Sequence, residues 1–240
     1  MTRREPAITR APDAGPDGLF YLDLHTHTSD GSNDAHATVE AYLRWIQRRR
    51  EAGYRIDGFV LTEHRNLDPR LDYSALAERY DAVVLRGMEV ETDTGHVLVY
   101  GVSDRFYREI DVLSVTLPYE DVFRAAREHG GIAVGAHAGR RRIGLAHHVD
   151  LAGIALDSVE LIEALNGGSS EQENARALLL GEQFNLGMIG GSDSHFVSTL
   201  GSYLTAFREP VRHMEALVEQ LRAGLVHAVT ADGARSVPVD

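Results

Sequence analysis

The sequence predicts an α/β fold built around a parallel sheet. Short apolar runs typical of buried strands alternate with segments of helical periodicity through most of the chain. Histidines and carboxylates recur where those strands end. The 240 residues suffice for one well-buried core. We therefore expect a single domain over 19–240. It follows a flexible extension over 1–18, which contains three prolines and little apolar sequence.

The elements follow one another in a regular order. Strands are expected over 19–24, 58–62, 82–85, 87–91, 97–102, 132–136, 158–162, 187–190, 203–207 and 226–230. Helices are expected over 39–52, 73–80, 120–129, 144–152, 170–184 and 211–223. Thr38 is suited to cap the first helix, and Gly53 lies where it should end.

Composition narrows the function. The chain has no cysteine, so a metal must be held by nitrogen and oxygen ligands, and 12 histidines are available. The formal net charge of -12 argues against a broad basic surface for nucleic acid. No apolar stretch resembles a signal peptide or a membrane span, so we expect a cytoplasmic protein without a membrane partner.

The stretch from Asp23 to Gly31 carries the clearest chemical signal. His25 and His27 are two residues apart after an apolar run, so in a strand both imidazoles point to the same face. Asp30 follows in a Ser-Asp-Gly turn. Imidazoles with a carboxylate suit Zn, Mn or Fe.

Further donors mark the ends of the later strands. They are His64, Glu89, His137, Asp193 and His195, with His96 close behind Glu89. With the first motif this makes nine donors, six imidazoles and three carboxylates. One ion takes about four to six ligands, so nine suit two or three ions with bridging carboxylates. In a β/α barrel such sites lie at the C-terminal rim.

Five motifs occur in an order that resembles the PHP (polymerase and histidinol phosphatase) family of metal-dependent phosphoesterases. They are Asp-Leu-His-Thr-His-Thr-Ser-Asp-Gly, Leu-Thr-Glu-His, Gly-Met-Glu-Val with His96, Gly-Ala-His-Ala-Gly and Gly-Gly-Ser-Asp-Ser-His. The resemblance spans 19–195. It implies a distorted (β/α)7 barrel related to the amidohydrolases, with two or three Mn, Zn or Fe ions at the rim. Its ligands are His25, His27, Asp30, His64, Glu89, His96, His137, Asp193 and His195.

The chain departs from the family pattern at two places. Glu63 stands where the family often has aspartate, in Thr62-Glu63-His64, and Ala138 follows His137 where proline is frequent. Neither change removes a ligand.

The resemblance implies hydrolysis of a phosphate monoester such as histidinol phosphate, a sugar phosphate or a nucleotide. Metal ions lower the pKa of a bound water and so supply a hydroxide nucleophile. Asp30 and Asp193 are candidates to orient that nucleophile, and His195 is a candidate proton donor. Arg65, Arg140 and Arg141 lie beside ligands, and guanidinium groups suit phosphate.

Other functions stay open. A 5'–3' exonuclease or oligonucleotide phosphodiesterase ranks lower, because only 7% of residues are aromatic and the chain is acidic. A hydrolase of the amidohydrolase type that does not act on phosphate is a further alternative. A noncatalytic PHP binding module is less favoured, because all nine ligands are present.

Overall fold

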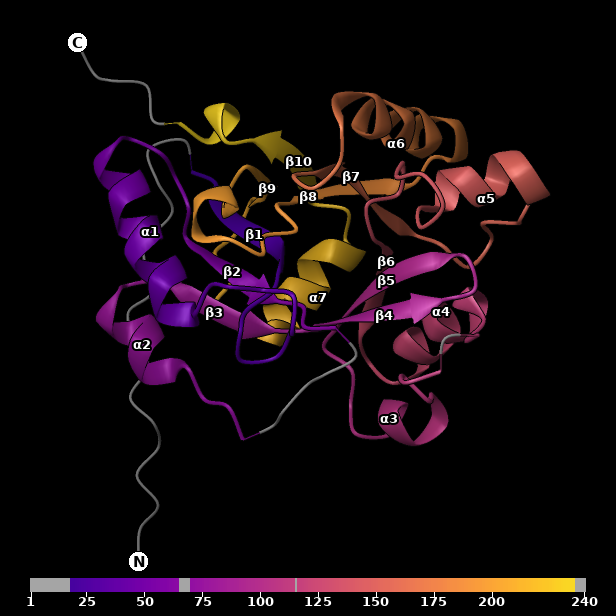
Figure 1. The fold of residues 1–240 in the computed structure, drawn as a ribbon, viewed down its shortest axis with the longest axis horizontal. Coiled ribbons are helices and arrows are strands. Elements are labelled where there is room, and N and C mark those ends of the chain that lie inside the picture. Colours follow the sequence, from indigo (N-terminus) through magenta and orange to yellow (C-terminus); the bar gives the residue numbers. More distant parts are fainter. Residues whose placement is uncertain (1–17, 65–69, 115, 236–240) are drawn as a thin grey trace, which may run out of the picture.

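Two five-stranded sheets form the framework of the protein (Figure 1). The computed structural model describes residues 18–64, 70–114 and 116–235. The first sheet has the order β10 (Val226–Thr230), β9 (Tyr203–Phe207), β1 (Phe20–Thr26), β2 (Gly58–Leu61) and β3 (Val83–Arg86). The second has the order β4 (Met88–Thr92), β5 (Gly95–Tyr100), β6 (Ile132–Gly135), β7 (Leu161–Asn166) and β8 (Gly187–Gly191). The flexible extension expected over 1–18 lies outside the described residues except for Gly18.

The sheets are mixed, and the expectation of a parallel sheet holds for only part of each. The neighbours β1, β2 and β3 run parallel, as do β6, β7 and β8. Antiparallel pairs join β9 to β1 and to β10, and β5 to β4 and to β6. The β4–β5 connection is a tight turn at Asp93 and Thr94, too short for the crossover that parallel strands require.

The distorted (β/α)7 barrel is not confirmed. In the described part of the chain, the hydrogen-bonded ladders form two separate sheets. Single bridges, Thr26–Ser194 and His64–Glu89, pair the sheets at two points. Both bridges involve residues at or beside the predicted ligands, so the two sheets meet at the ends of the strands that carry the site.

Helices surround the sheets, and α7 (Met214–Arg222) lies across them (Figure 1). The helices are α1 (Val39–Glu51), α2 (Ser74–Arg79), α3 (Phe106–Glu109), α4 (Tyr119–Glu128), α5 (Leu145–Ala152), α6 (Glu171–Phe184) and α7, with short 3-10 turns at Val197–Thr199 and Asp232–Ala234. The predicted helices are confirmed within a few residues, and α3 is an addition. Thr38 caps α1 as expected, its side chain accepting from the Ala41 amide. Within the described ranges, no helix has the length and apolar character to cross a membrane, and the cytoplasmic location stays a prediction.

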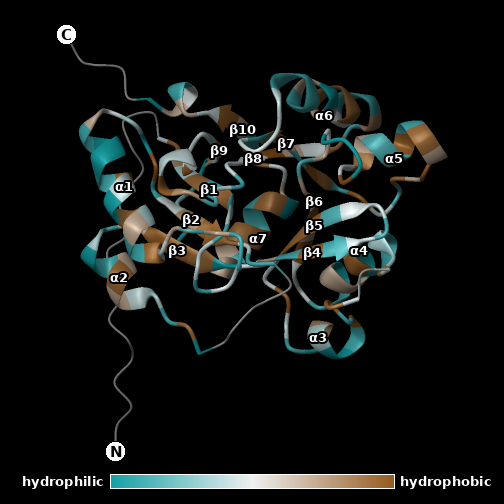
Figure 2. Ribbon diagram, viewed as in Figure 1, coloured by the Kyte–Doolittle hydropathy of each residue, from teal (hydrophilic) through white to brown (hydrophobic). Residues whose placement is uncertain are grey.

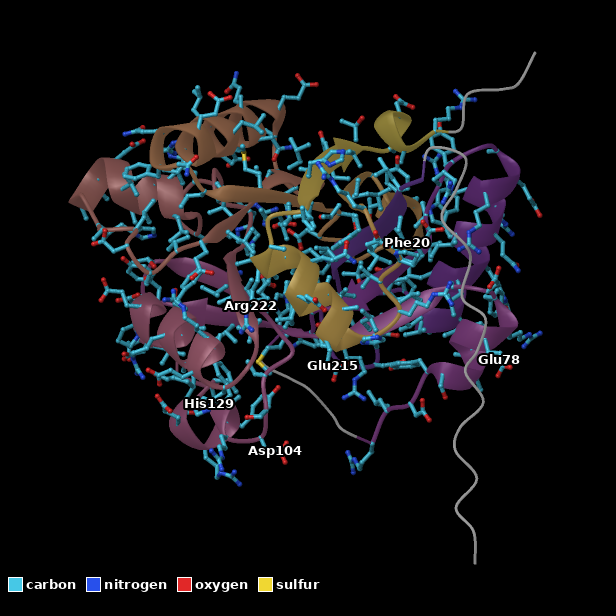
Figure 3. All side chains as sticks on the ribbon, turned by 180° about the vertical axis from the view of Figure 1, so that it is seen from behind. Phe20, Glu78, Asp104, His129, Glu215 and Arg222 are labelled. Carbon is cyan, nitrogen blue, oxygen red and sulfur yellow. The ribbon has the colours of Figure 1, made fainter. Side chains whose placement is uncertain are left out.

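Three apolar clusters hold these layers together. The central cluster lies between the sheets and joins Leu22 of β1, Leu98 of β5 and Leu221 of α7. The other two lie under α1 on the first sheet and under α4 and α6 on the second. Figure 2 shows the strands as the apolar part of the molecule, with polar helix surfaces outside. Figure 3, seen from behind, shows α7 lying across the two sheets.

The position of α7 decides which end of the fold is open. Its residue Leu217 joins the same cluster as Phe20, the first residue of β1. The predicted ligands His25 and His27 lie at the other end of β1. The helix therefore covers the N-terminal end of this strand, and loops surround the opposite end, which carries the ligands.

Tyr42 of α1 ties the ends of β1 and β8 together. Its buried hydroxyl lies 2.8 Å from the carbonyl oxygens of His27 and of Ser194. We expect Tyr42→Phe to lower the free energy of unfolding by about 1–3 kcal/mol, because it leaves a buried carbonyl without its donor. Urea denaturation of the metal-free protein measures the change. Tyr107→Phe is the matched control, because the Tyr107 hydroxyl is buried without a hydrogen-bond partner among the described residues. Equal losses in both variants would contradict the prediction.

Candidate metal centre

The structure brings eight of the nine predicted ligands together. Their nitrogen and oxygen atoms form three groups, each with its members within 4.8 Å of one another. The groups are His25, His27 and Asp193; His27, His64 and His195; and Glu89, His96 and His137. His27 belongs to two groups, and its Nε2 lies 3.4 Å from Glu89 Oε2 in the third, so the three groups form one extended centre.

The strand ends position these side chains. His25 lies in β1 and His27 directly follows it, and their rings are 5.1 Å apart on one face as predicted. His137 and Asp193, which follow β6 and β8, have positive φ values of 31° and 52°. Left-handed backbone is costly for residues other than glycine and gathers at functional sites. Here it occurs at two ligand candidates, where the chain turns out of the sheet.

Glu89 is the middle of the centre. Its Oε1 lies 2.9 Å from His96 Nδ1 and 3.1 Å from His137 Nε2. Its Oε2 lies 3.1 Å from His64 Nδ1 and 3.4 Å from His27 Nε2. The two oxygens of one buried carboxylate thus face different histidines, which is the arrangement of a bridging ligand.

A buried glutamate orients His25. Glu163 is fully buried in β7, and its oxygens lie 3.0 and 3.1 Å from His25 Nδ1. A carboxylate accepts hydrogen bonds, so Nδ1 carries the proton, and Nε2 is left free to bind an ion. Glu163 also accepts a bond of 2.6 Å from the backbone amide of His137.

A serine and a second glutamate orient His27 in a similar way. The Ser32 hydroxyl lies 2.5 Å from Glu63 Oε2 and must donate to it. Ser32 Oγ then accepts from His27 Nδ1, 3.3 Å away, so His27 also carries its proton on Nδ1. Glu63 further accepts from the Thr28 amide and hydroxyl, which fixes the loop after β1.

These two tautomers create a demand for a cation. When both imidazoles are neutral and both Nδ1 atoms carry the proton, the Nε2 lone pairs of His25 and His27 face each other across 3.1 Å. Asp193 Oδ1 lies 3.5 Å from each of them. Acceptors so close repel one another unless a positive charge lies between them, so the residues present fit a divalent ion.

The pKa values agree with this donor chemistry. Burial lowers the pKa of His27 to about 4 and lowers that of His137, so both imidazoles are neutral at pH 7. Burial alone would raise the pKa of Glu89 and of Asp193, but the charge of His25 holds both well below their usual range. For His25, burial is outweighed by Glu163, Asp193 and Glu89, which raise the pKa well above its usual value. An ion at this site takes the place of that proton.

Asp30 does not join the centre. Its Oδ2 instead accepts a 2.9 Å hydrogen bond from the Tyr73 hydroxyl, and its side chain is exposed. Asp34, four residues later in the same loop, lies there instead. Its Oδ2 is 3.3 Å from His64 Nε2 and 3.4 Å from His195 Nε2, and its side chain is 52% exposed. The loop therefore delivers a carboxylate, but a different one from the residue expected.

Of the predicted phosphate ligands, Arg140 reaches the centre. Its Nη2 lies 2.7 Å from Asp193 Oδ2 and its side chain is 21% exposed. The Arg141 side chain points to the exposed surface, while its amide bonds to Glu173. Arg65 lies outside the described residues.

Sequence reasoning missed three supporting residues, Asp34, Glu163 and Asn166. Glu163 carried a signal, because a carboxylate inside the apolar run 161–165 must find a buried partner. Little in the sequence indicates a role for Asp34, because its loop holds two aspartates and the loop conformation decides which one faces the strand ends. Asn166 stood before two glycines and read as a turn.

One family model and several solved structures are similar to this chain. The model of the PHP-associated family matches residues 171–226. PsfC from Pseudomonas syringae is 17% identical over 88% of this chain and 91% of its own, with a TM-score of 0.61. A candidate metal-dependent phosphoesterase from Bifidobacterium adolescentis is 17% identical over 84% of this chain and 95% of its own, with a TM-score of 0.54.

A third similar structure is larger. The lesion-specific endonuclease EndoQ from Pyrococcus furiosus is 15% identical over 88% of this chain, with a TM-score of 0.63, and the match covers 57% of that protein. A comparison with curated proteins gave no match. Fold and site together define an α/β protein with a clustered imidazole and carboxylate centre. The PHP-associated model matches this chain over 171–226, and the solved structures, each under 25% identical, share its fold.

We expect Mn²⁺ to stabilise the metal-free protein. An ion that binds only the folded state stabilises it by about 2.7 kcal/mol at 100 times its dissociation constant. Thermal unfolding with and without Mn²⁺ measures the shift in Tm, and His27→Ala should abolish most of it. The control is His213→Ala, because that imidazole is exposed and distant from the centre in the fold. A shift that survives in His27→Ala would show that Mn²⁺ binds elsewhere.

Proposed function

We propose that the protein is a metal-dependent phosphoesterase that hydrolyses phosphate monoesters. The observation that carries this proposal is Glu89, whose two oxygens face separate groups of histidines. A shared carboxylate suits ions that lie close together, and neighbouring divalent ions are suited to a phosphoryl group. The similar fold of the Bifidobacterium protein supports the same reaction class.

The proposed ligands are the eight clustered residues together with Asp34. We assign them to two or three ions of Mn, Zn or Fe, because the donors are imidazole nitrogen and carboxylate oxygen. Asp34 replaces Asp30 in this set, because its carboxylate contacts His64 and His195 and that of Asp30 does not.

When bound, such ions lower the pKa of a water molecule and neutralise phosphoryl oxygens. The side chains of this protein supply the orientation. His195 Nδ1 donates a hydrogen bond to the Asp193 carbonyl oxygen at 2.9 Å. The lone pair of Nε2 is therefore free to bind an ion at the centre. His195 is therefore assigned as a ligand rather than as the proton donor to the leaving group. Asp193 is held by Arg140, so its second oxygen stays directed toward His25 and His27.

Two other substrate classes compete with a small phosphate monoester. One similar structure is Endonuclease Q in complex with a 27-mer duplex substrate that has an abasic lesion at the active site. The net charge of -12 favours a small phosphorylated substrate over a nucleic acid for this chain. A similar fold is also seen in an amidohydrolase from Chromobacterium violaceum, so hydrolysis at a centre other than phosphorus is the outcome to test beside these.

Asp34 and Asp30 give a matched pair of variants. We expect Asp34→Ala to lower the number of Mn²⁺ ions bound, or to weaken one of them about tenfold, because it removes a carboxylate beside two histidines. Asp30→Ala should leave metal binding unchanged. Metal content after equilibrium dialysis measures both. The assignment is wrong if Asp30→Ala loses an ion and Asp34→Ala keeps all of them.

The activity itself is tested by phosphate release from the Mn-loaded protein. The panel holds histidinol phosphate, sugar phosphates, mononucleotides, a 5'-phosphorylated oligonucleotide and an abasic duplex. We expect turnover of a monoester, and Asp193→Ala or His27→Ala should abolish it while the folded structure is retained. Circular dichroism of the same samples is the control for folding.

The outcomes separate the alternatives. Cleavage of the oligonucleotide or duplex alone would favour the nuclease function. Silence across the panel with metal confirmed bound would exclude the phosphoesterase proposal and favour an amide hydrolase or a binding module.

A further inference from the structure

A buried hydrogen-bonded chain links two ligands of the same candidate ion. It runs from His25 through Glu163, Asn166 and Arg140 to Asp193. Its two ends meet again at the centre, where His25 Nε2 lies 3.5 Å from Asp193 Oδ1. The five residues therefore form a ring of contacts with one gap, between His25 and Asp193, where the ion would lie.

Asn166 is the middle of this ring. It is fully buried at the end of β7, and its Nδ2 donates to Glu163 Oε2 at 2.9 Å. Its Oδ1 accepts from Arg140 Nη2 at 2.7 Å and from the Gly168 amide at 2.9 Å. Guanidinium and backbone N–H groups can only donate, so the orientation of the amide is fixed. Asparagine is required here because one side needs a donor and the other an acceptor.

Arg140 is held by the protein along one edge. Its Nε donates to Ser169 Oγ at 3.2 Å, while Nη2 donates to Asn166 and to Asp193 Oδ2. That edge is the one a guanidinium normally offers to a phosphate in bidentate fashion. Among the described residues no hydrogen bond engages Nη1, so Nη1 is what Arg140 has left for a substrate oxygen. On the edge formed by Nε and Nη2, Arg140 contacts Asp193 Oδ2.

The surrounding backbone makes room for this arrangement. A Cβ at Gly168 would lie 2.5 Å from Arg140 Nη2 and 2.8 Å from Asp193 Oδ2, so a larger residue would displace the pair. The backbone of Asn166 is held separately, because the Asn174 amide bonds to both its N–H and its carbonyl oxygen. The Asn166 side chain is thus not needed to anchor its own strand end.

We propose that Asn166 is a positioning residue that fixes His25 through Glu163 and Asp193 through Arg140, so that both donors hold one ion. The inference rests on the metal-binding part of the proposed function. It adds that the affinity of this ion depends on an amide that does not touch it. The proposal also gives Arg140 a main role as the partner of Asp193, with contact to the substrate as a secondary role.

The test is Mn²⁺ binding by calorimetry to the metal-free protein. Asn166→Asp keeps the shape but loses the donor to Glu163, and it sets a carboxylate against another carboxylate. We expect it to weaken one Mn²⁺ ion about 10–100-fold, the usual effect of losing a partner behind a ligand. Gln220→Glu is the matched control. It makes the same change at a buried amide that is bonded to Glu209, next to α7, and should leave Mn²⁺ binding unchanged.

A second pair of variants tests the connection. Arg140→Ala should weaken the same ion, and the double variant with Asn166→Asp should lose less than the product of the two single effects, because both act along one path. Should Asn166→Asp fail to fold, Arg140→Ala and Ser169→Ala decide the matter, since both side chains reach toward the surface. Unchanged Mn²⁺ binding with a raised KM in Arg140→Ala would overturn the proposal and make Arg140 a substrate ligand alone. If the wild-type protein binds no Mn²⁺, the proposed function is wrong, and the positioning role of Asn166 is wrong with it.

Discussion

The repulsion between acceptor atoms at the ends of β1, β4 and β8 is the constraint on which the site depends. Two imidazole lone pairs and two carboxylates converge within a few ångströms, in a buried region that screens charge poorly. Glu163, Ser32 and Arg140 each bind the side of a donor that faces away from the centre. These contacts hold the donors in the repulsive geometry that a cation makes favourable.

The fold meets this constraint by joining two sheets at their ligand-bearing ends. The bridges Thr26–Ser194 and His64–Glu89 pair strands of different sheets beside the donors. Tyr42 adds a third link, since its hydroxyl bonds to carbonyl groups on both sides. Large apolar residues fill the other end under α7. The polar centre therefore lies on a well-packed base, which keeps the strand ends from spreading under the charge they carry.

The sequence could predict what depends on local periodicity. Buried strands, helix boundaries and the histidines at strand ends all followed from short-range patterns, and the capped helix beginning at Val39 is one example. Sheet pairing could not be predicted in the same way, because whether β9 lies beside β1 in antiparallel fashion is decided by packing between distant segments. The hydrogen-bond partners of the ligands are equally non-local, and Glu163 meets His25 across 138 positions of the chain.

The exchange of Asp30 for Asp34 follows from the same kind of contact. Glu63, which stands where the resembling family often has aspartate, accepts from Thr28 and from Ser32 at once. This draws the loop over its carboxylate, and Gly31 sits where a Cβ would collide with the Glu63 side chain. A loop pinned at Thr28 and Ser32 turns Asp30 outward and brings Asp34 to His64 and His195. Glu63, the outward turn of Asp30 and the approach of Asp34 to the two histidines belong to one local arrangement of this loop.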